Sequence, residues 1–195
     1  MIADAKPKPI LLLTGFEPFD SFDSNPSWEA ADEVAKRLSG SVVALRLPVD
    51  YFESRRQLIT AIADINPITC LCMGLAPFDE FRLEEVARKP KEFAGLRGKS
   101  FLRGTWPWVN TETILRSERI PYRRSHDAGQ YVCESTYWSL LDFGGTYFQG
   151  MHMGFMHVPA LSPLFPLRRT ADIVYRIVNA YVSASLLQRQ IRSTA

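Results

Sequence analysis

The sequence predicts an α/β fold: a single-domain, three-layer sandwich with an open, twisted, mostly parallel sheet and helices on both faces. Between residues 8 and 74, short apolar runs alternate with amphipathic segments in the order strand, helix, strand, helix, strand. This order requires right-handed crossovers between parallel strands. The 195 residues, 46% of them hydrophobic, are enough for one core. Because composition nowhere breaks, we expect one domain over residues 1–195, with a flexible leader at 1–8.

Elements of the first half are marked by apolar runs that end at glycine or proline. Asn25 followed by Pro26 is typical of a helix N-cap with proline at the first helical position. Glycines mark the expected ends of the strands and of this helix. The expected elements are a strand at 8–14, a loop at 15–20, a helix from 26 to Gly40, a strand at 41–47, a helix at 51–65 and a strand at 68–73 closed by Gly74.

The second half begins less regularly and ends in two well-marked helices around a strand. In the last helix, small and β-branched residues recur at helical spacing, which predicts a buried stripe of Ile173, Ile177, Ala180 and Ala184. The expected elements are a strand at 83–87, a basic loop at 88–105, a helix at 111–117 capped by Asn110, a strand at 121–125, a helix at 133–143 ended by Gly144 and Gly145, a strand at 151–157 and a helix at 169–187.

Charge and hydropathy argue against nucleic-acid and membrane partners. Lys and Arg number 23 against 21 Asp and Glu, a net charge of +2. This balance is too even for a dedicated nucleic-acid or membrane-surface protein. No apolar run approaches the ~18 residues of a membrane span, and residues 1–9 lack a secretory signal, so we expect a cytoplasmic protein. A weaker hypothesis is RNA contact through Arg97, Arg103, Arg116, Arg119, Arg123 and Arg124.

Two of the three cysteines are expected to be core residues. Cys70 and Cys72 lie in one apolar run, where a strand would direct both to the same face as small hydrophobic side chains. A lone Cys-x-Cys pair is a poor zinc signature because no second pair or nearby histidine completes four ligands. We therefore expect no metal.

Cys133 is different because it opens a predicted helix after a turn at Gly129. The N-terminus of a helix carries partial positive charge and unsatisfied N–H groups. Both would lower the pKa of the thiol and hold an oxyanion on a substrate carbonyl. A structural, buried cysteine is the alternative interpretation.

A nucleophilic thiol needs a base, and the chain has three histidines. His157 ends a predicted strand, at the sheet edge where open α/β sheets place reactive groups. His152 would face the opposite side, and His126 precedes the turn. A third group, Glu84 or Glu85, would orient the imidazole from the same edge.

The chain resembles the pyroglutamyl peptidase I, or pyrrolidone-carboxylate peptidase, family. The matching segments, in family order, are Leu13-Thr-Gly-Phe-Glu-Pro-Phe19, Asn25-Pro-Ser-Trp28, Gly74-Leu-Ala-Pro77, Leu83-Glu-Glu-Val-Ala87, Asp127-Ala-Gly-Gln-Tyr-Val-Cys133 and Gly154-Phe-Met-His-Val-Pro159. The resemblance implies a Cys-His-Glu triad, no cofactor or metal, a peptide substrate with a blocked N-terminus, and homo-oligomers (dimers or tetramers).

Residue roles follow from the resemblance position by position. Cys133 corresponds to the nucleophile, His157 to the general base and then acid, and Glu84 to the group that orients the imidazole. Phe16 and Phe19 correspond to aromatic residues around the lactam ring, and Leu75 stands where the family often has glutamine.

Departures from the family pattern concern specificity. Phe78-Asp79 replaces a Gly-Arg pair, and the segment at 88–125 is short. The spacing from Gly74 favours Glu85 as the triad acid, whereas the match at residues 86–87 favours Glu84, which we choose. Alternative functions are a thiol amidohydrolase of different acyl specificity and a catalytically weak homologue that binds a small ligand.

Overall fold

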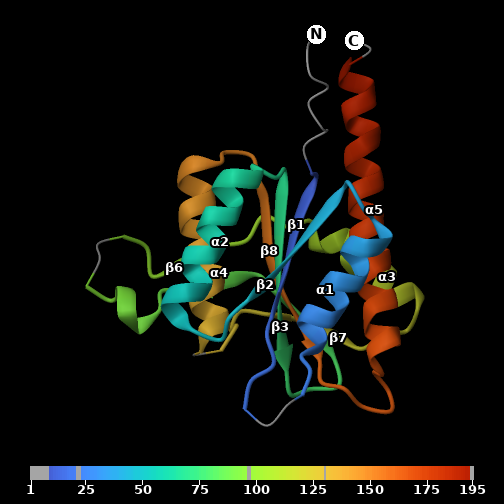
Figure 1. Ribbon diagram of the computed structural model, residues 1–195, viewed down its shortest axis with the longest axis horizontal. Helices are drawn as coiled ribbons and strands as arrows, with labels where there is room; N and C mark the ends of the chain where they lie inside the picture. The colour runs from blue at the N-terminus through green and yellow to red at the C-terminus, as the bar shows by residue number, and fades with distance from the viewer. Residues whose placement is uncertain (1–8, 21–22, 96–97, 130, 194–195) are drawn as a thin grey trace.

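The computed structural model describes residues 9–20, 23–95, 98–129 and 131–193. Its centre is a six-stranded sheet with the strand order β2-β1-β3-β8-β4-β7 (Figure 1). The strands are β1 (Leu11–Phe16), β2 (Val42–Leu47), β3 (Thr69–Ala76), β4 (Phe81–Glu84), β7 (Tyr122–Ser125) and β8 (His152–Pro159). Strands β2, β1, β3 and β8 are parallel, whereas β4 runs antiparallel to β8 and β7 parallel to β4. The expected mostly parallel sheet is confirmed.

Helices cover both faces of the sheet, which gives the expected three layers. On one face, α1 (Pro26–Arg37), α3 (Trp108–Ser117) and α5 (Leu167–Ser193) enclose one apolar core with the sheet. On the other face, α2 (Tyr51–Ile65) and α4 (Val132–Tyr147) enclose a second core, which holds both Cys70 and Cys72. Figure 1 shows the sheet between α2 and α4 on its left and α1, α3 and α5 on its right.

The first two helices begin where the sequence indicates. The Asn25 side chain accepts a hydrogen bond from the Ser27 N–H, and Pro26 fills the first helical position. Asp50 caps α2 in the same manner, and Asn66 ends it in a left-handed conformation with φ 50°. Helix α2 has the predicted bounds, and α1 ends at Arg37, before Gly40.

Of the four glycines that were expected to end a strand or helix but lie inside one, three also mark close approaches: Gly15, Gly74 and Gly144. Strand β1 continues through Gly15 to Phe16, and a glycine is required at position 15 because a Cβ atom there would collide with the backbone of Ser27 in α1. Strand β3 continues through Gly74 to Ala76. Helix α4 continues through Gly144, which packs against Met153. These glycines mark close approaches between elements.

The middle of the chain is more ordered than expected. The strand expected at 83–87 is two strands, β4 and β5 (Val86–Arg88), separated at Glu85. Strand β5 forms an antiparallel hairpin with β6 (Phe101–Arg103), and between them lies a 3₁₀ turn, η1 (Lys91–Phe93). The prediction of a loop over residues 88–105 is therefore wrong in part, because this segment contains η1 and β6. Helix α3 begins at Trp108 after Pro107, so Asn110 is not its cap.

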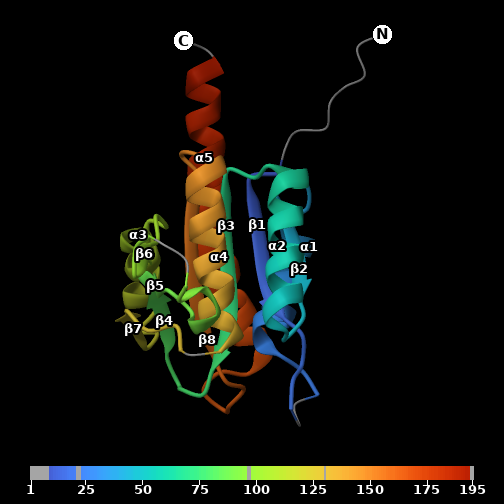
Figure 2. The same ribbon diagram turned by 90° about the vertical axis from the view of Figure 1, so that its left-hand side faces the viewer.

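Helix α5 is longer than expected and buries a different stripe. Ile173 and Ile177 are buried as expected, but Ala180 and Ala184 are exposed, and the stripe continues through Val178 and Val182. The C-terminal part of the helix extends past the sheet (Figure 2). Among the described residues, no helix is long and apolar enough to cross a membrane. The leader expected at 1–8 lies outside these residues.

Candidate active site

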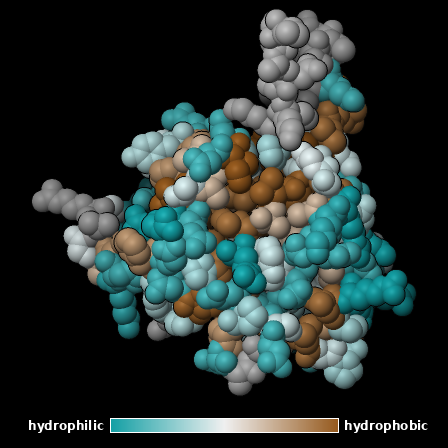
Figure 3. All heavy atoms as spheres, in the orientation of Figure 1, coloured by the Kyte–Doolittle hydropathy of each residue, from teal (hydrophilic) through white to brown (hydrophobic). Residues whose placement is uncertain are grey.

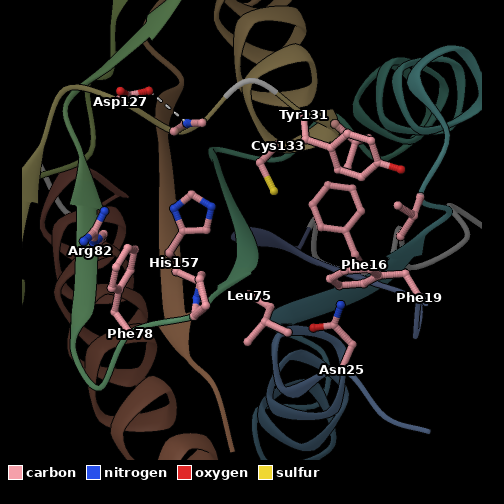
Figure 4. Close-up of a pocket in the computed structure, with 16 residues that line it drawn as sticks. Phe16, Phe19, Asn25, Leu75, Phe78, Arg82, Asp127, Tyr131, Cys133 and His157 are labelled. Carbon is pink, nitrogen blue, oxygen red and sulfur yellow. Dashed lines mark hydrogen bonds between the residues drawn. The ribbon is translucent and has the colours of Figure 1, made fainter. Parts of the chain in front are cut away.

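A cavity of about 220 Å³ opens where β1, β3 and β8 end and α4 begins (Figure 4). Cys133, His157, Phe16, Phe19 and Leu75 all line it, so the structure brings together five of the six residues singled out from the sequence. The sixth, Glu84, lies buried behind His157. This position, at the carboxyl ends of parallel strands, is where open α/β sheets bind ligands.

Cys133 is the second residue of α4, and its side chain is half-buried at the cavity. Gly74 of β3 lies close to both the thiol and the imidazole of His157. A Cβ atom on Gly74 would lie 2.9 Å from Sγ of Cys133 and 3.1 Å from Cδ2 of His157. The absent side chain leaves room for both groups, and Figure 4 shows the sulfur between the rings of His157 and Phe16.

The other edge of the His157 ring contacts a carboxylate. Nδ1–H of His157 donates a hydrogen bond to Oε1 of Glu84 over 2.8 Å, and Glu84 is fully buried. Because Nδ1 is hydrogen-bonded to the carboxylate, the nitrogen that can exchange a proton with the thiol is Nε2, which neighbours Cδ2 in the ring. Such an arrangement fixes the tautomer and the orientation of the ring.

Tyr137 holds the backbone of Glu84 in place. Its hydroxyl group donates a hydrogen bond to the carbonyl oxygen of Glu84 over 2.9 Å, inside the core. Gly104 follows β6 and packs against this hydroxyl, so a side chain there would collide with it. The sequence predicted Tyr137 only as one residue of the helix expected at 133–143. The missed signal is chemical, since a buried tyrosine hydroxyl needs a partner.

Glu85 belongs to a separate, surface cluster. Its carboxylate accepts hydrogen bonds from Nε2 of His126 and from Arg124, both over 2.6 Å. These two hydrogen bonds, of which the one from His126 has the larger effect, hold the pKa of the Glu85 carboxyl below its ordinary value. The third histidine, His152, donates from Nδ1 to the carbonyl oxygen of Thr105, far from the thiol along β8.

The expected lowering of the Cys133 pKa is wrong. Burial raises the pKa of the thiol to about 12, and the nearby Glu84 carboxylate adds to this increase. A hydrogen bond from the backbone N–H of Cys133 acts in the opposite direction but is the smaller effect. The helix terminus is present as predicted, but burial of the thiol sets the direction of the shift. At neutral pH the sulfur is therefore a thiol.

The cavity has an apolar half beside Cys133. Phe16, Phe19 and Leu75 lie there, together with Tyr131, which leads into α4. Asn25 also lines this half, although its amide is already used: Nδ2 donates to the Glu17 carbonyl, and Oδ1 caps α1. The arrangement suits a small, neutral, ring-shaped group.

The described residues also bear on the metal and RNA hypotheses. Within the described ranges, no three His, Cys, Asp or Glu side chains cluster in a way that could hold a metal ion. Of the arginines in the RNA hypothesis, Arg97 lies outside the described residues. Four others form ion pairs with Glu80, Glu85 or Glu112: Arg103, Arg116, Arg123 and Arg124.

Residues 9–89 match the family model described as pyroglutamyl peptidase. A pyrrolidone-carboxylate peptidase from Clavibacter michiganensis is 31% identical over 172 residues, covering 77% of this chain and 78% of the relative. One from Brachyspira hyodysenteriae is 28% identical over 198 residues, covering 90% and 98%. The crystal structure of pyroglutamyl peptidase I from Bacillus amyloliquefaciens superposes with a TM-score of 0.74 at 27% identity, covering 86% of this chain and 91% of that one.

Proposed function

The chain belongs to the pyroglutamyl peptidase family, a family of cysteine peptidases, and from this premise we propose that it hydrolyses the amide bond after an N-terminal pyroglutamyl residue. The observation that carries the proposal is the arrangement at Gly74. The thiol of Cys133 and the ring of His157 both lie close to this residue, and Glu84 holds Nδ1 of the ring.

In the proposed first step, Sγ of Cys133 attacks the carbonyl carbon of the pyroglutamyl residue. Because the resting sulfur is a thiol, its proton passes to Nε2 of His157 as the S–C bond forms. The amide groups in the first turn of α4 stabilise the oxyanion. The C–N bond then breaks, and His157 gives the proton to the departing amine, which leaves a thioester on Cys133.

In the second step, water hydrolyses the thioester. His157 takes a proton from the water, and the hydroxide attacks the thioester carbonyl. The C–S bond breaks, the sulfur recovers a proton from His157, and pyroglutamic acid is released. Glu84 stabilises the imidazolium ion that forms in both steps.

The apolar half of the cavity supports the choice of acyl group. A pyroglutamyl residue is a neutral lactam without a free amino group, so burying it against Phe16, Phe19 and Leu75 requires no desolvation of a charge. A peptide that begins with an unblocked residue would bring an ammonium group into this half at a cost of several kcal/mol. The proposed substrate is therefore a peptide with a blocked N-terminus.

The test is release of aminomethylcoumarin from pyroglutamyl-aminomethylcoumarin by the wild type and by Cys133→Ala. Prolyl-aminomethylcoumarin, which has a similar ring but a charged amine, is the control substrate. We expect turnover of the pyroglutamyl compound alone, and none by Cys133→Ala. Turnover of other acyl amides instead would indicate a thiol amidohydrolase of different specificity. Binding of pyroglutamate without turnover would indicate a ligand-binding homologue.

The proposal includes assembly into homo-oligomers and a cytoplasmic location. Leu186, Leu187 and Ile191 are exposed on the part of α5 that extends past the sheet, where Figure 3 shows apolar surface. Light scattering of the wild type and of Leu187→Glu tests this assembly, since the charge should shift the chain towards monomers. A reducing compartment would keep the nucleophilic sulfur as a thiol.

A further inference from the structure

The half of the cavity beyond His157 has a different character from the half that holds Phe16 and Phe19. Arg82 and Phe78 line it (Figure 4). In the β4–β8 pairing, Arg82 lies directly opposite His157, so the two side chains lie on the same face of the sheet. A cationic group is thereby placed beside the imidazole, on the side away from the apolar half.

The guanidinium group of Arg82 is held in a defined position. It stacks on the ring of Phe78, with Cζ 3.4 Å from the ring centroid. Its Nε donates to Oε1 of Glu80 over 3.3 Å, and the side chain is 20% exposed. The terminal amino groups of a guanidinium carry four further donors in a planar fork, which matches a carboxylate.

The charges around Arg82 favour an anion. Glu80 is shared, because Arg123 also pairs with it over 3.2 Å, so two guanidinium groups face one carboxylate. The other acidic residue at this side of the cavity, Asp127, pairs with Arg88 over 3.2 Å. Around Glu80 the two guanidinium groups leave one net positive charge, and the Asp127–Arg88 ion pair adds none.

The direction of the substrate follows from the proposed function, on which this inference rests. His157 must protonate the departing amine, so the leaving peptide lies on the His157 side of the sulfur. The pyroglutamyl ring then lies in the apolar half, and the residue that follows it lies over Phe78 and Arg82. We propose that Arg82, stacked on Phe78, binds a carboxylate of this following residue and so selects among blocked peptides.

Arg82 would bind a carboxylate from either of two sources in the same way. One source is an acidic side chain, and the other is the terminal carboxylate of a dipeptide. The experiment compares two pairs of substrates. One pair is pyroglutamyl-glutamate amide against pyroglutamyl-glutamine amide, and the other is pyroglutamyl-alanine against its amide. Release of the amine is followed for each, and kcat/KM gives the ratio within each pair.

For the wild type we expect kcat/KM of the acidic substrate to exceed that of its neutral counterpart roughly tenfold in at least one pair. The pair that shows this preference identifies the source of the carboxylate. Arg82→Gln should bring that ratio close to one, mainly through KM. The matched control is Arg123→Gln, which removes the second partner of Glu80 on the exposed surface and should preserve the preference. Two results would overturn the inference. One is a wild-type kcat/KM ratio near one in both pairs, and the other is an equal loss of kcat/KM on all four substrates in Arg82→Gln.

A binding measurement separates this inference from the proposed function. Calorimetry of Cys133→Ala with the same four compounds reports the preference without turnover. Tighter binding of the acid supports the role of Arg82 even if the wild type cleaves none of them. Equal binding within both pairs overturns the inference, whatever the outcome of the activity assay.

Discussion

Glu84 and His157 lie diagonally across the antiparallel pair formed by β4 and β8, and their side chains meet in a 2.8 Å hydrogen bond. Glu84 is paired with Phe155, two residues before His157, so both side chains are on one face. Glu85 follows β4 and carries its carboxylate to the surface cluster with His126. The alternation of a strand thus separates two adjacent glutamates into a buried partner of the imidazole and a surface ion-pair residue.

Glu84→Gln should lower kcat on pyroglutamyl-aminomethylcoumarin by a factor on the order of 10² to 10⁴. The amide cannot stabilise the imidazolium ion and favours the wrong tautomer of His157. Glu85→Gln is the matched control, one residue along the chain, and should keep kcat within about twofold. Thermal unfolding would be measured for both variants. A larger loss of kcat in Glu85→Gln would reverse the assignment of the triad acid.

Gly74→Ala should lower kcat/KM by up to roughly 10²-fold while the protein stays folded. The new methyl group would lie 2.9 Å from Sγ of Cys133, 3.0 Å from the Phe155 ring and 3.1 Å from the His157 ring, so these side chains must shift. Displacements near 1 Å are enough to cost that factor. Gly145→Ala is the control, because nothing lies within 4 Å of its Cβ position in α4, and it should stabilise the helix by up to about 1 kcal/mol. Wild-type activity in Gly74→Ala would contradict the proposed contact.

Local signals predicted most of the fold and singled out Cys133 and His157, whereas Phe16, Phe19, Leu75 and the choice of Glu84 came from the family resemblance. Helix α2 has the predicted bounds because Asp50 and Asn66 supply capping chemistry that depends only on neighbouring residues. The errors at Gly15, Gly74 and Gly144 share one cause. A glycine required by a close approach of another element cannot be distinguished, in the sequence, from a glycine that ends a strand or helix.

Other features depended on distant parts of the chain. The pKa of Cys133 was predicted from the helix that this residue opens, whereas burial in the folded protein decides the direction of the shift. The role of Tyr137 depends on the Glu84 carbonyl, 53 residues away in the chain, and the position of Arg82 depends on strand register. No local pattern contains this information.

Alkylation of Cys133 by iodoacetamide should accelerate about tenfold per pH unit from pH 6 to pH 9, without a plateau. A thiol with a pKa of about 12 gains thiolate in proportion to hydroxide throughout this range. Cys70 and Cys72 are fully buried, so mass spectrometry of the folded protein should find Cys133 alone modified. A rate that levels off below pH 8 would demonstrate a preformed thiolate and contradict the expected direction of the pKa.

Glu134→Gln should stabilise the protein at pH 8 but change its stability little at pH 5. Burial raises the pKa of Glu134 to about 7, and Oε1 accepts a 2.6 Å hydrogen bond from the Arg88 N–H that glutamine can still accept. A carboxyl whose pKa is higher in the folded state than its ordinary 4.5 destabilises the fold as pH rises through this interval, and the full cost is present above pH 7. Removing the charge should therefore raise the free energy of unfolding at pH 8 by about 1 to 3 kcal/mol. Urea unfolding at both pH values measures the difference, and an equal effect at pH 5 and pH 8 would show that the side chain acts through packing alone.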